Sequence, residues 1–178
     1  MQSLSSRLGL SLLGLMLASS AHGATTLTGQ LSSTLTLTAS CQVNGAVGTT
    51  GLSFGTLNFG SQTTLFSSAN AQVVSGSNNG ISILCSPGTT STLKVRAGLH
   101  DTLSAPNTRA LADSAGNYVG YDIFTDSGLT TVLPVDGTVP VPVSTGTANV
   151  INLYGKAVGK ASLPPGTYTD SVAVELTF

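Results

Sequence analysis

A long stretch of strict alternation, residues 25–43, limits the possible folds of this chain more than any other feature. Successive side chains of a β-strand point to opposite faces, so the stretch TTLTGQLSSTLTLTASCQV predicts a strand with one buried side. A typical strand has about five or six residues, whereas this pattern continues for about fifteen. The small and apolar side of this strand consists of Leu27, Gly29, Leu31, Ser33, Leu35, Leu37 and Ala39.

The first 23 residues have the parts of a secretory signal peptide. Arg7 is their only charged residue, the apolar run LGLSLLGLMLA ends at Ala18, and small residues follow. Cleavage after Gly23 fits this pattern, and cleavage after Ala21 also fits. The apolar run is short for a membrane span, so an uncleaved anchor is the weaker alternative. We therefore expect an exported chain of about 155 residues, a length that suits one domain.

Composition excludes several classes of function. Charged residues make up 7% of the sequence, and losing Arg7 leaves five Lys/Arg against seven Asp/Glu. No basic cluster is present to hold phosphates, so nucleic acid is not an expected partner. A metal site needs three or four ligands, and no His or second Cys pair stands near the two cysteines. We therefore expect neither a metal nor another cofactor.

The two cysteines, Cys41 and Cys85, predict one disulfide. An even pair in an exported chain is typical of a disulfide rather than of free thiols. The bridge would close a loop of about 45 residues, for which the chain-entropy model gives a stabilisation of roughly 4 kcal/mol.

Strand patterns recur along the rest of the chain, and helical periodicity is nearly absent. The two prolines of residues 138–144 restrict that segment to an edge strand or an extended loop. In the last segment, Val172, Val174, Leu176 and Phe178 share one face, which Asp170 interrupts. Seven or more short strands predict a single all-β domain, an immunoglobulin-like β-sandwich. The expected strand segments are 53–60, 71–76, 81–86, 91–99, 118–126, 138–144, 148–158 and 167–178.

Nothing in the sequence favours an enzyme. Residues 51–55, GLSFG, match the G-x-S-x-G pattern, but that motif requires a turn from a strand into a helix, and no helix pattern follows. Only His100 remains after cleavage to complete a triad. We expect His100 and Asp101 to lie in a solvated turn. The chain also lacks a phosphate-binding glycine loop at a helix start, so no small-molecule substrate is expected.

The long N-terminal strand has two interpretations. It can be the first strand of a complete, self-contained sandwich. Alternatively, the domain lacks one strand and exposes an apolar groove beside its C-terminal strand, and the N-terminal segment of another copy fills that groove. Such a contact is head-to-tail and produces filaments.

Four motifs in order carry a family resemblance. They are LTGQLSSTLTLTASCQV with Cys41, FGTLNFG at residues 54–60, ISILCS with Cys85, and the ending GTYTDSVAVELTF. With these motifs the chain resembles the spore coat protein U domain family and, within it, the major subunits of archaic (Csu-type) chaperone–usher pili. The resemblance covers essentially the whole mature chain.

The resemblance implies a sandwich that lacks its last strand and is completed by donor-strand exchange. A periplasmic chaperone would lend a strand first, and at the outer-membrane usher the next subunit would replace it. The implied organisation is a signal peptide at 1–23, a donor segment at 24–35 and a pilin-like domain at 36–178. The donor residues would be Leu27, Gly29, Leu31 and Leu35, and the groove edge would be Val172, Val174, Leu176 and Phe178.

The function implied is that of a structural subunit of a surface fimbria. The chain would be exported through the periplasm and would join other pilus subunits as a homopolymer or an adaptor, in fibres of the kind that serve cell adhesion and biofilm formation. The alternatives are a secreted coat protein and a monomeric module that binds a surface or a carbohydrate.

Overall fold

The computed structural model describes residues 23–178, so the predicted signal peptide, except Gly23, lies outside the described residues. The chain divides into two units, one ending at Thr36 and one spanning Leu37–Phe178. Among the described residues, no helix is long and apolar enough to cross a membrane.

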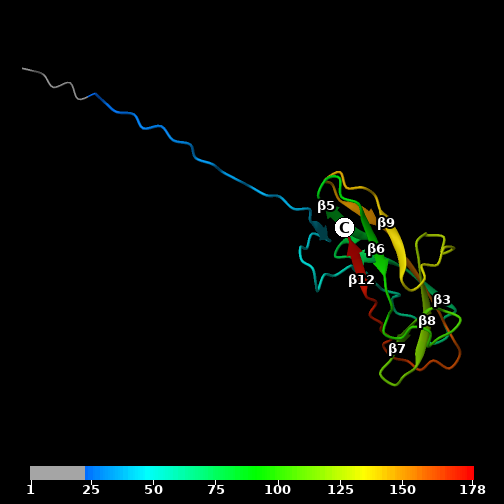
Figure 1. The fold of residues 1–178 in the computed structure, drawn as a ribbon. Helices are drawn as coiled ribbons and strands as arrows, with labels where there is room; N and C mark the ends of the chain where they lie inside the picture. The colour runs from blue at the N-terminus through cyan, green and yellow to red at the C-terminus, as the bar shows by residue number, and fades with distance from the viewer. Residues whose placement is uncertain (1–22) are drawn as a thin grey trace, which may run out of the picture. The chain divides into compact units, whose positions relative to one another are not determined.

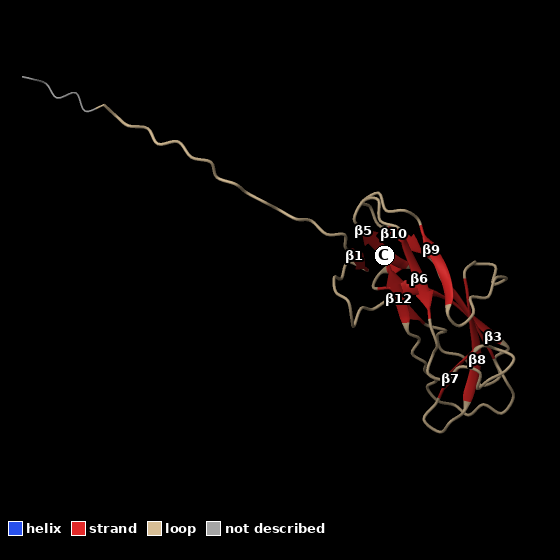
Figure 2. Cartoon of the chain, in the orientation of Figure 1, coloured by secondary structure: helices blue, strands red, loops and turns tan. Residues whose placement is uncertain are grey.

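The second unit is an all-β, immunoglobulin-like sandwich, as the sequence predicted, and Figure 2 shows only strands and loops in the described residues. All strand pairs are antiparallel, and they form three sheets with the orders β1-β5-β10, β2-β3-β11-β8-β7 and β12-β6-β9. A short strand, β4, also pairs with β3. The strands are β1 (Cys41–Val43), β2 (Thr56–Leu57), β3 (Ser68–Ser75), β4 (Asn78–Asn79), β5 (Ile81–Cys85), β6 (Ser91–Val95), β7 (Arg109–Ala112), β8 (Tyr118–Phe124), β9 (Gly137–Val141), β10 (Asn149–Ile151), β11 (Tyr154–Val158) and β12 (Val174–Thr177).

Side chains from all three sheets meet in one core, and alternation determines which of them enter it. In β5, Ile81 and Ile83 are buried, and in β6, Leu93 and Val95 are buried, while the residues between them are partly exposed. Figure 1 shows β12 beside β6, close to the C-terminus, and the two strands pair from Val174–Val95 to Thr177–Thr92. The C-terminal strand therefore joins the sandwich along one of its edges.

The predicted disulfide is present. Cys41 and Cys85 occupy directly opposite positions of β1 and β5, and a disulfide joins them. The bridge therefore ties the first strand of the domain to a central strand of its sheet.

The prediction of one strand across residues 25–43 is wrong for the single chain. Only Cys41–Val43 form a strand, while residues 23–40 carry no strand and are exposed. Leu27 is 90% exposed and Leu31 is 96% exposed. Alternation shows which face a strand would bury, but a strand also needs a partner for its backbone N–H and C=O groups.

Other segments also differ from the predictions. Of the strands predicted at 53–60 and 167–178, only Thr56–Leu57 and Val174–Thr177 are strands. Residues 148–158 form two strands, because the chain leaves the sheet of β5 at Ile151 and enters the sheet of β3 and β8 at Tyr154. The strand predicted at 91–99 ends at Val95, and Leu99 is 71% exposed. Strand β7 was missed because its pattern does not alternate, with both Arg109 and Ala110 buried. The proline-containing β9 is an edge strand, as predicted, since it pairs with β6 alone.

Candidate strand-binding groove

Two adjoining cavities open between residues 52–66 and the C-terminal segment 163–174. The Tyr168 cavity has a volume of about 620 Å³ and the Val172 cavity a volume of about 580 Å³. We call the two cavities together the groove. They adjoin, because five residues line both of them: Thr56, Leu57, Phe59, Leu111 and Asp170.

Each wall of the groove includes part of a strand with an unpaired edge, Thr56–Leu57 of β2 on one side and Val174 of β12 on the other. Among the strands of residues 23–178, β2 pairs only with β3, and β12 pairs only with β6. Before β12, Ala173 exchanges backbone hydrogen bonds with Arg96 and Ala97, and Thr169 pairs with Ala112. A strand edge without a partner can pair with an added strand. The backbone that borders the groove can therefore pair with an added strand.

Glycines allow the first wall to lie close to the neighbouring sheet. Gly55 has a φ of 113°, and a Cβ there would lie 2.7 Å from the carbonyl oxygen of Val74. A Cβ on Gly155 of β11 would lie 2.5 Å from Leu57 Cδ2. Larger residues at either position would push the wall away from the sheet, so the glycines fix Leu57 and Phe59 against the floor of the groove.

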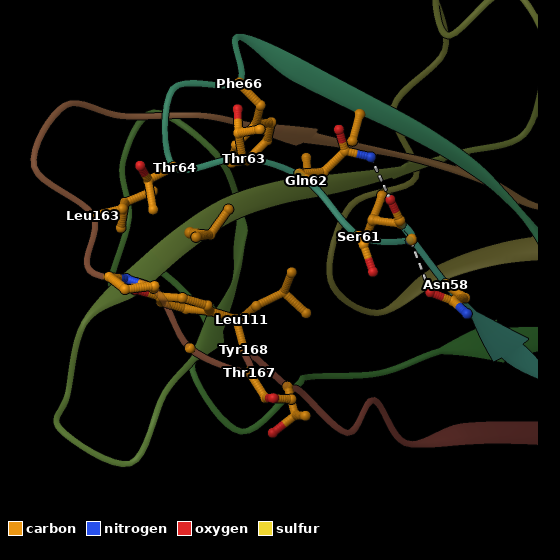
Figure 3. Close-up of a pocket in the computed structure, with 18 of the residues that line it drawn as sticks. Asn58, Ser61, Gln62, Thr63, Thr64, Phe66, Leu111, Leu163, Thr167 and Tyr168 are labelled. Atoms are coloured by element: carbon orange, nitrogen blue, oxygen red, sulfur yellow. Dashed lines mark hydrogen bonds between the residues drawn. The ribbon is translucent and has the colours of Figure 1, made fainter.

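Local hydrogen bonds hold the rim of the Tyr168 cavity (Figure 3). Gln62 Nε2 donates to the carbonyl oxygen of Phe59 at 2.9 Å, and Gly60 N donates to Asn58 Oδ1 at 2.8 Å. On the opposite side, the Tyr168 hydroxyl donates to the carbonyl oxygen of Pro164 at 2.8 Å. Both rims are thus shaped by turns of their own segments and do not need a contact across the cavity.

The Val172 cavity reaches the hydrophobic core. Its lining includes the core residues Val73, Ile81, Val95, Ile123 and Leu153. Core side chains that border an open cavity favour the arrival of further apolar groups, because burying those groups removes apolar surface from water. Apolar side chains are therefore the occupants that this cavity fits best.

A buried carboxylate lies where the two cavities meet. The Asp170 side chain is 2% exposed, and it accepts hydrogen bonds from the Tyr121 hydroxyl at 2.7 Å and from Leu99 N at 2.9 Å. His100 Nδ1 lies 3.4 Å from Asp170 Oδ1. Burial raises the pKa of the Tyr121 phenol far above its usual range, and the hydrogen bond to Asp170 raises it further. Tyr121 therefore keeps its proton and remains a donor to Asp170.

The predicted groove-edge residues occupy different environments. Val172 and Val174 are half-buried and line the Val172 cavity. Leu176 is half-buried and Phe178 is 57% exposed, and neither lines the groove. The opposite wall, residues 52–66, was not predicted as part of the groove, although the glycine-bounded FGTLNFG motif was a usable signal. Asp170 was predicted only as an interruption of an apolar face.

The suspected catalytic motifs have structural roles. Ser53 of the G-x-S-x-G match accepts a hydrogen bond from Gly55 N at 3.3 Å, and the short strand β2 follows it. His100 and Asp101 lie in a turn, as predicted, but the turn is only partly solvated, since the His100 side chain is 28% exposed and Asp101 accepts a hydrogen bond from Gly98 N. No group of three His, Cys, Asp or Glu residues within 23–178 is placed to hold a metal ion.

The chain was compared with known proteins in three ways. No curated protein matches the chain. Among solved structures, one match is the CsuC–CsuE chaperone–tip adhesion subunit pre-assembly complex from archaic chaperone–usher Csu pili of Acinetobacter baumannii. The identity is 20% and the TM-score 0.46, over 80% of this chain and 40% of the matched chain. A sequence model of the Spore Coat Protein U domain matches residues 27–175, and this chain therefore belongs to the spore coat protein U domain family.

Proposed function

We propose that this protein is a structural subunit of a surface fimbria assembled by the chaperone–usher route. Each subunit donates residues 24–35 to the groove of a neighbouring subunit and accepts the same segment from another. The observation that carries the proposal is the groove itself, in which two cavities reach the core between two unpaired strand edges.

The donor segment has the chemistry that this groove requires. Leu27, Leu31 and Leu35 are 90%, 96% and 81% exposed, and they lie on one face of an alternating sequence. An added strand pairs its backbone with a sheet edge and places alternate side chains into pockets. The segment can therefore satisfy the edges and fill the cavities at the same time.

The free energy expected from burying the donor leucines is large enough to make dissociation of the fibre slow. Fully burying one leucine side chain contributes roughly 1.5–3 kcal/mol, so three leucines contribute several kcal/mol before the backbone hydrogen bonds are counted. Dissociation would expose all of this surface again in one step. The fibre is therefore expected to persist mainly because dissociation is slow.

The implied partners follow from the exposed groove. An unfilled groove that reaches the core is an aggregation hazard for an exported monomer. We propose that a periplasmic chaperone covers it during export and that an outer-membrane usher exchanges the chaperone for the next subunit. The fibre then lies on the cell surface as a homopolymer or with this chain as an adaptor.

A coat protein is the second candidate. The family's description refers to a spore coat, and strand exchange between copies would serve a coat as well as a fibre. The two candidates share the groove and the donor segment. They differ in whether the assembled protein forms thin fibres or a continuous layer, which electron microscopy of intact cells distinguishes.

The first test compares wild type with a deletion of residues 24–34. Surface material from cells that produce the chain with its neighbouring gene products is run in detergent, unheated and boiled. We expect wild type to give a ladder of multimers that collapses on boiling, and the deletion to give only monomer. A single monomer band for unheated wild type would instead mean a self-complete sandwich and would contradict the proposal.

A further inference from the structure

The groove is divided by a fixed polar block. Asp170 lines both cavities, while Tyr168 lines only one and Val172 only the other. These three residues occupy positions i, i+2 and i+4, and burial alternates from Tyr168 to Val174 as in a strand. The groove therefore presents a cavity, a block and a second cavity along three successive inward positions.

The Asp170 side chain cannot move out of the way. Its oxygens accept from the Tyr121 hydroxyl and from Leu99 N, and a Cβ on Gly98 would collide with Asp170 Oδ2. The carboxylate is thus packed directly against the backbone at Gly98. With 2% of the side chain exposed, little surface remains for an added side chain to contact.

The block determines which donor residues can lie beside it. Residues 168–172 precede β12 and form an isolated bridge to Ala112 at Thr169. A donor strand that pairs along this segment would bring its own positions i, i+2 and i+4 to the same three sites. The two cavities have similar volumes, about 620 and 580 Å³, and each is suited to a large apolar side chain. At the middle site lies the Asp170 side chain, which is enclosed and hydrogen-bonded. The donor triplet that matches these three sites has a large apolar side chain, then a very small residue, then a second large apolar side chain.

Two triplets of the donor segment have large outer residues. In Leu27–Gly29–Leu31 the middle residue has no side chain, and in Leu31–Ser33–Leu35 the middle residue is a serine. Ser33 would place a hydroxymethyl group on a carboxylate that is already enclosed and hydrogen-bonded. Gly29 adds nothing at that point and lets the donor backbone approach closely.

We propose that Asp170 sets the register of strand exchange, with Gly29 of the donor subunit opposite Asp170 of the acceptor and Leu27 and Leu31 in the two cavities. This inference rests on the proposed function. It makes Asp170 a specificity-determining residue that rejects any donor with a side chain at the middle position.

Cysteine pairs report the register directly. Ser171, next to Asp170, is exposed, and every second donor residue points away from the groove. Chains carrying Ser171→Cys are combined with one donor substitution each, oxidised, boiled and run without reductant. Because Thr28 and Gln30 flank Gly29, one of them lies opposite Ser171, whichever way the donor runs. We expect the strongest cross-linked ladder with Thr28→Cys or Gln30→Cys, and little with the controls Ser32→Cys and Thr34→Cys.

A matched pair of substitutions tests the size of the middle site. Gly29→Leu places a side chain against Asp170, and overpacking of this kind should lower the yield of heat-sensitive multimers by roughly tenfold or more. Ser33→Leu adds the same type of side chain two positions beyond Leu31, and we expect its yield to stay close to wild type. Both substitutions lie outside the folded domain, so they do not change the acceptor.

The outcomes separate the register from the function. Strong cross-links at Ser32→Cys or Thr34→Cys, with Ser33→Leu inactive and Gly29→Leu active, would overturn the register and retain strand exchange. Equal cross-linking at all positions would overturn a fixed register. Absence of multimers from unsubstituted chain would overturn the proposed function, and this register with it.

Discussion

At the scale of single residues, the sequence predicted the pairing of the two cysteines but not the buried surroundings of Asp170. The disulfide was predicted because an even pair of cysteines in a chain expected to be exported favours one bridge over free thiols. Asp170 was visible only as a polar residue on an apolar face. Its partners, Tyr121 and the backbone of Leu99, are 49 and 71 residues away in the chain. Such long-range pairing has no local pattern, so this part of the site required the structure.

The Tyr121–Asp170 pair predicts sensitivity to alkaline pH. The phenol has an ordinary pKa of 10.0, and burial raises it in the folded protein. Above about pH 10 the unfolded chain loses this proton while the folded chain keeps it, so the pair's contribution to stability falls as pH rises. Tyr121→Phe removes this dependence, and at neutral pH it costs about 1.5–3 kcal/mol through the lost hydrogen bond to a carboxylate.

Thermal unfolding between pH 8 and pH 11 checks this expectation. Tyr121→Phe should lower the midpoint at pH 8 and flatten its decline above pH 10. Tyr154→Phe on β11 removes a phenol elsewhere in the fold and is the control for loss of a hydroxyl group. If Tyr121→Phe declines as steeply as wild type, another group is responsible for the alkaline loss.

The disulfide predicts a second residue-scale effect. Replacing both Cys41 and Cys85 with Ser frees a loop with a sequence separation of 44, which costs roughly 4 kcal/mol in the chain-entropy model. For a chain of this size the thermal midpoint should drop by roughly 10 °C. Wild type measured with reductant is the matched control and should fall to a similar midpoint. An unchanged midpoint would mean that the bridge does not stabilise the domain.

At the scale of strands, alternation predicted most segments but not their ends or their partners. The patterns at Ile81–Cys85 and Ser91–Val95 were interpreted correctly, because one face of each strand is in the core. The boundary between β10 and β11 was missed because only residues 152 and 153 separate the two strands, and the chain changes sheets there. The N-terminal segment has a clear alternating pattern, but within residues 23–178 it has no strand partner. Sequence periodicity identifies the apolar face of the N-terminal segment. Only the structure shows the groove in which that face could be buried.

A charge on the inward face of the donor segment should prevent exchange. Leu31→Asp would place a carboxylate in an apolar cavity without a partner, and such burial costs several kcal/mol. We expect heat-sensitive multimers to disappear while the domain still folds and is exported with its chaperone. Gln30→Asp carries the same charge on the outward face and should assemble normally. Normal multimers from Leu31→Asp would show that this face does not enter the groove.

At the scale of the whole molecule, the proposed donor segment and the groove belong to different parts of one chain. A contact between two different surfaces is heterologous, so it continues until an end is blocked. Each subunit then has one role in which it donates and one in which it accepts. This separation means that the two roles can be removed independently.

A subunit that cannot donate and a subunit that cannot accept should therefore form one donor–groove contact when they are combined. A chain lacking residues 24–34 can accept but not donate, and a Val172→Arg chain, with a long cation in the groove, can donate but not accept. Alone, each should remain monomeric in unheated detergent gels. Produced together, they should form one heterodimer and no species larger than a dimer, because the only available contact joins the intact donor to the intact groove.

The Val172→Arg chain is first shown to be folded by its thermal transition. Longer ladders from the mixture would point to a second polymerising contact, and a folded pair without a dimer would contradict exchange through this groove.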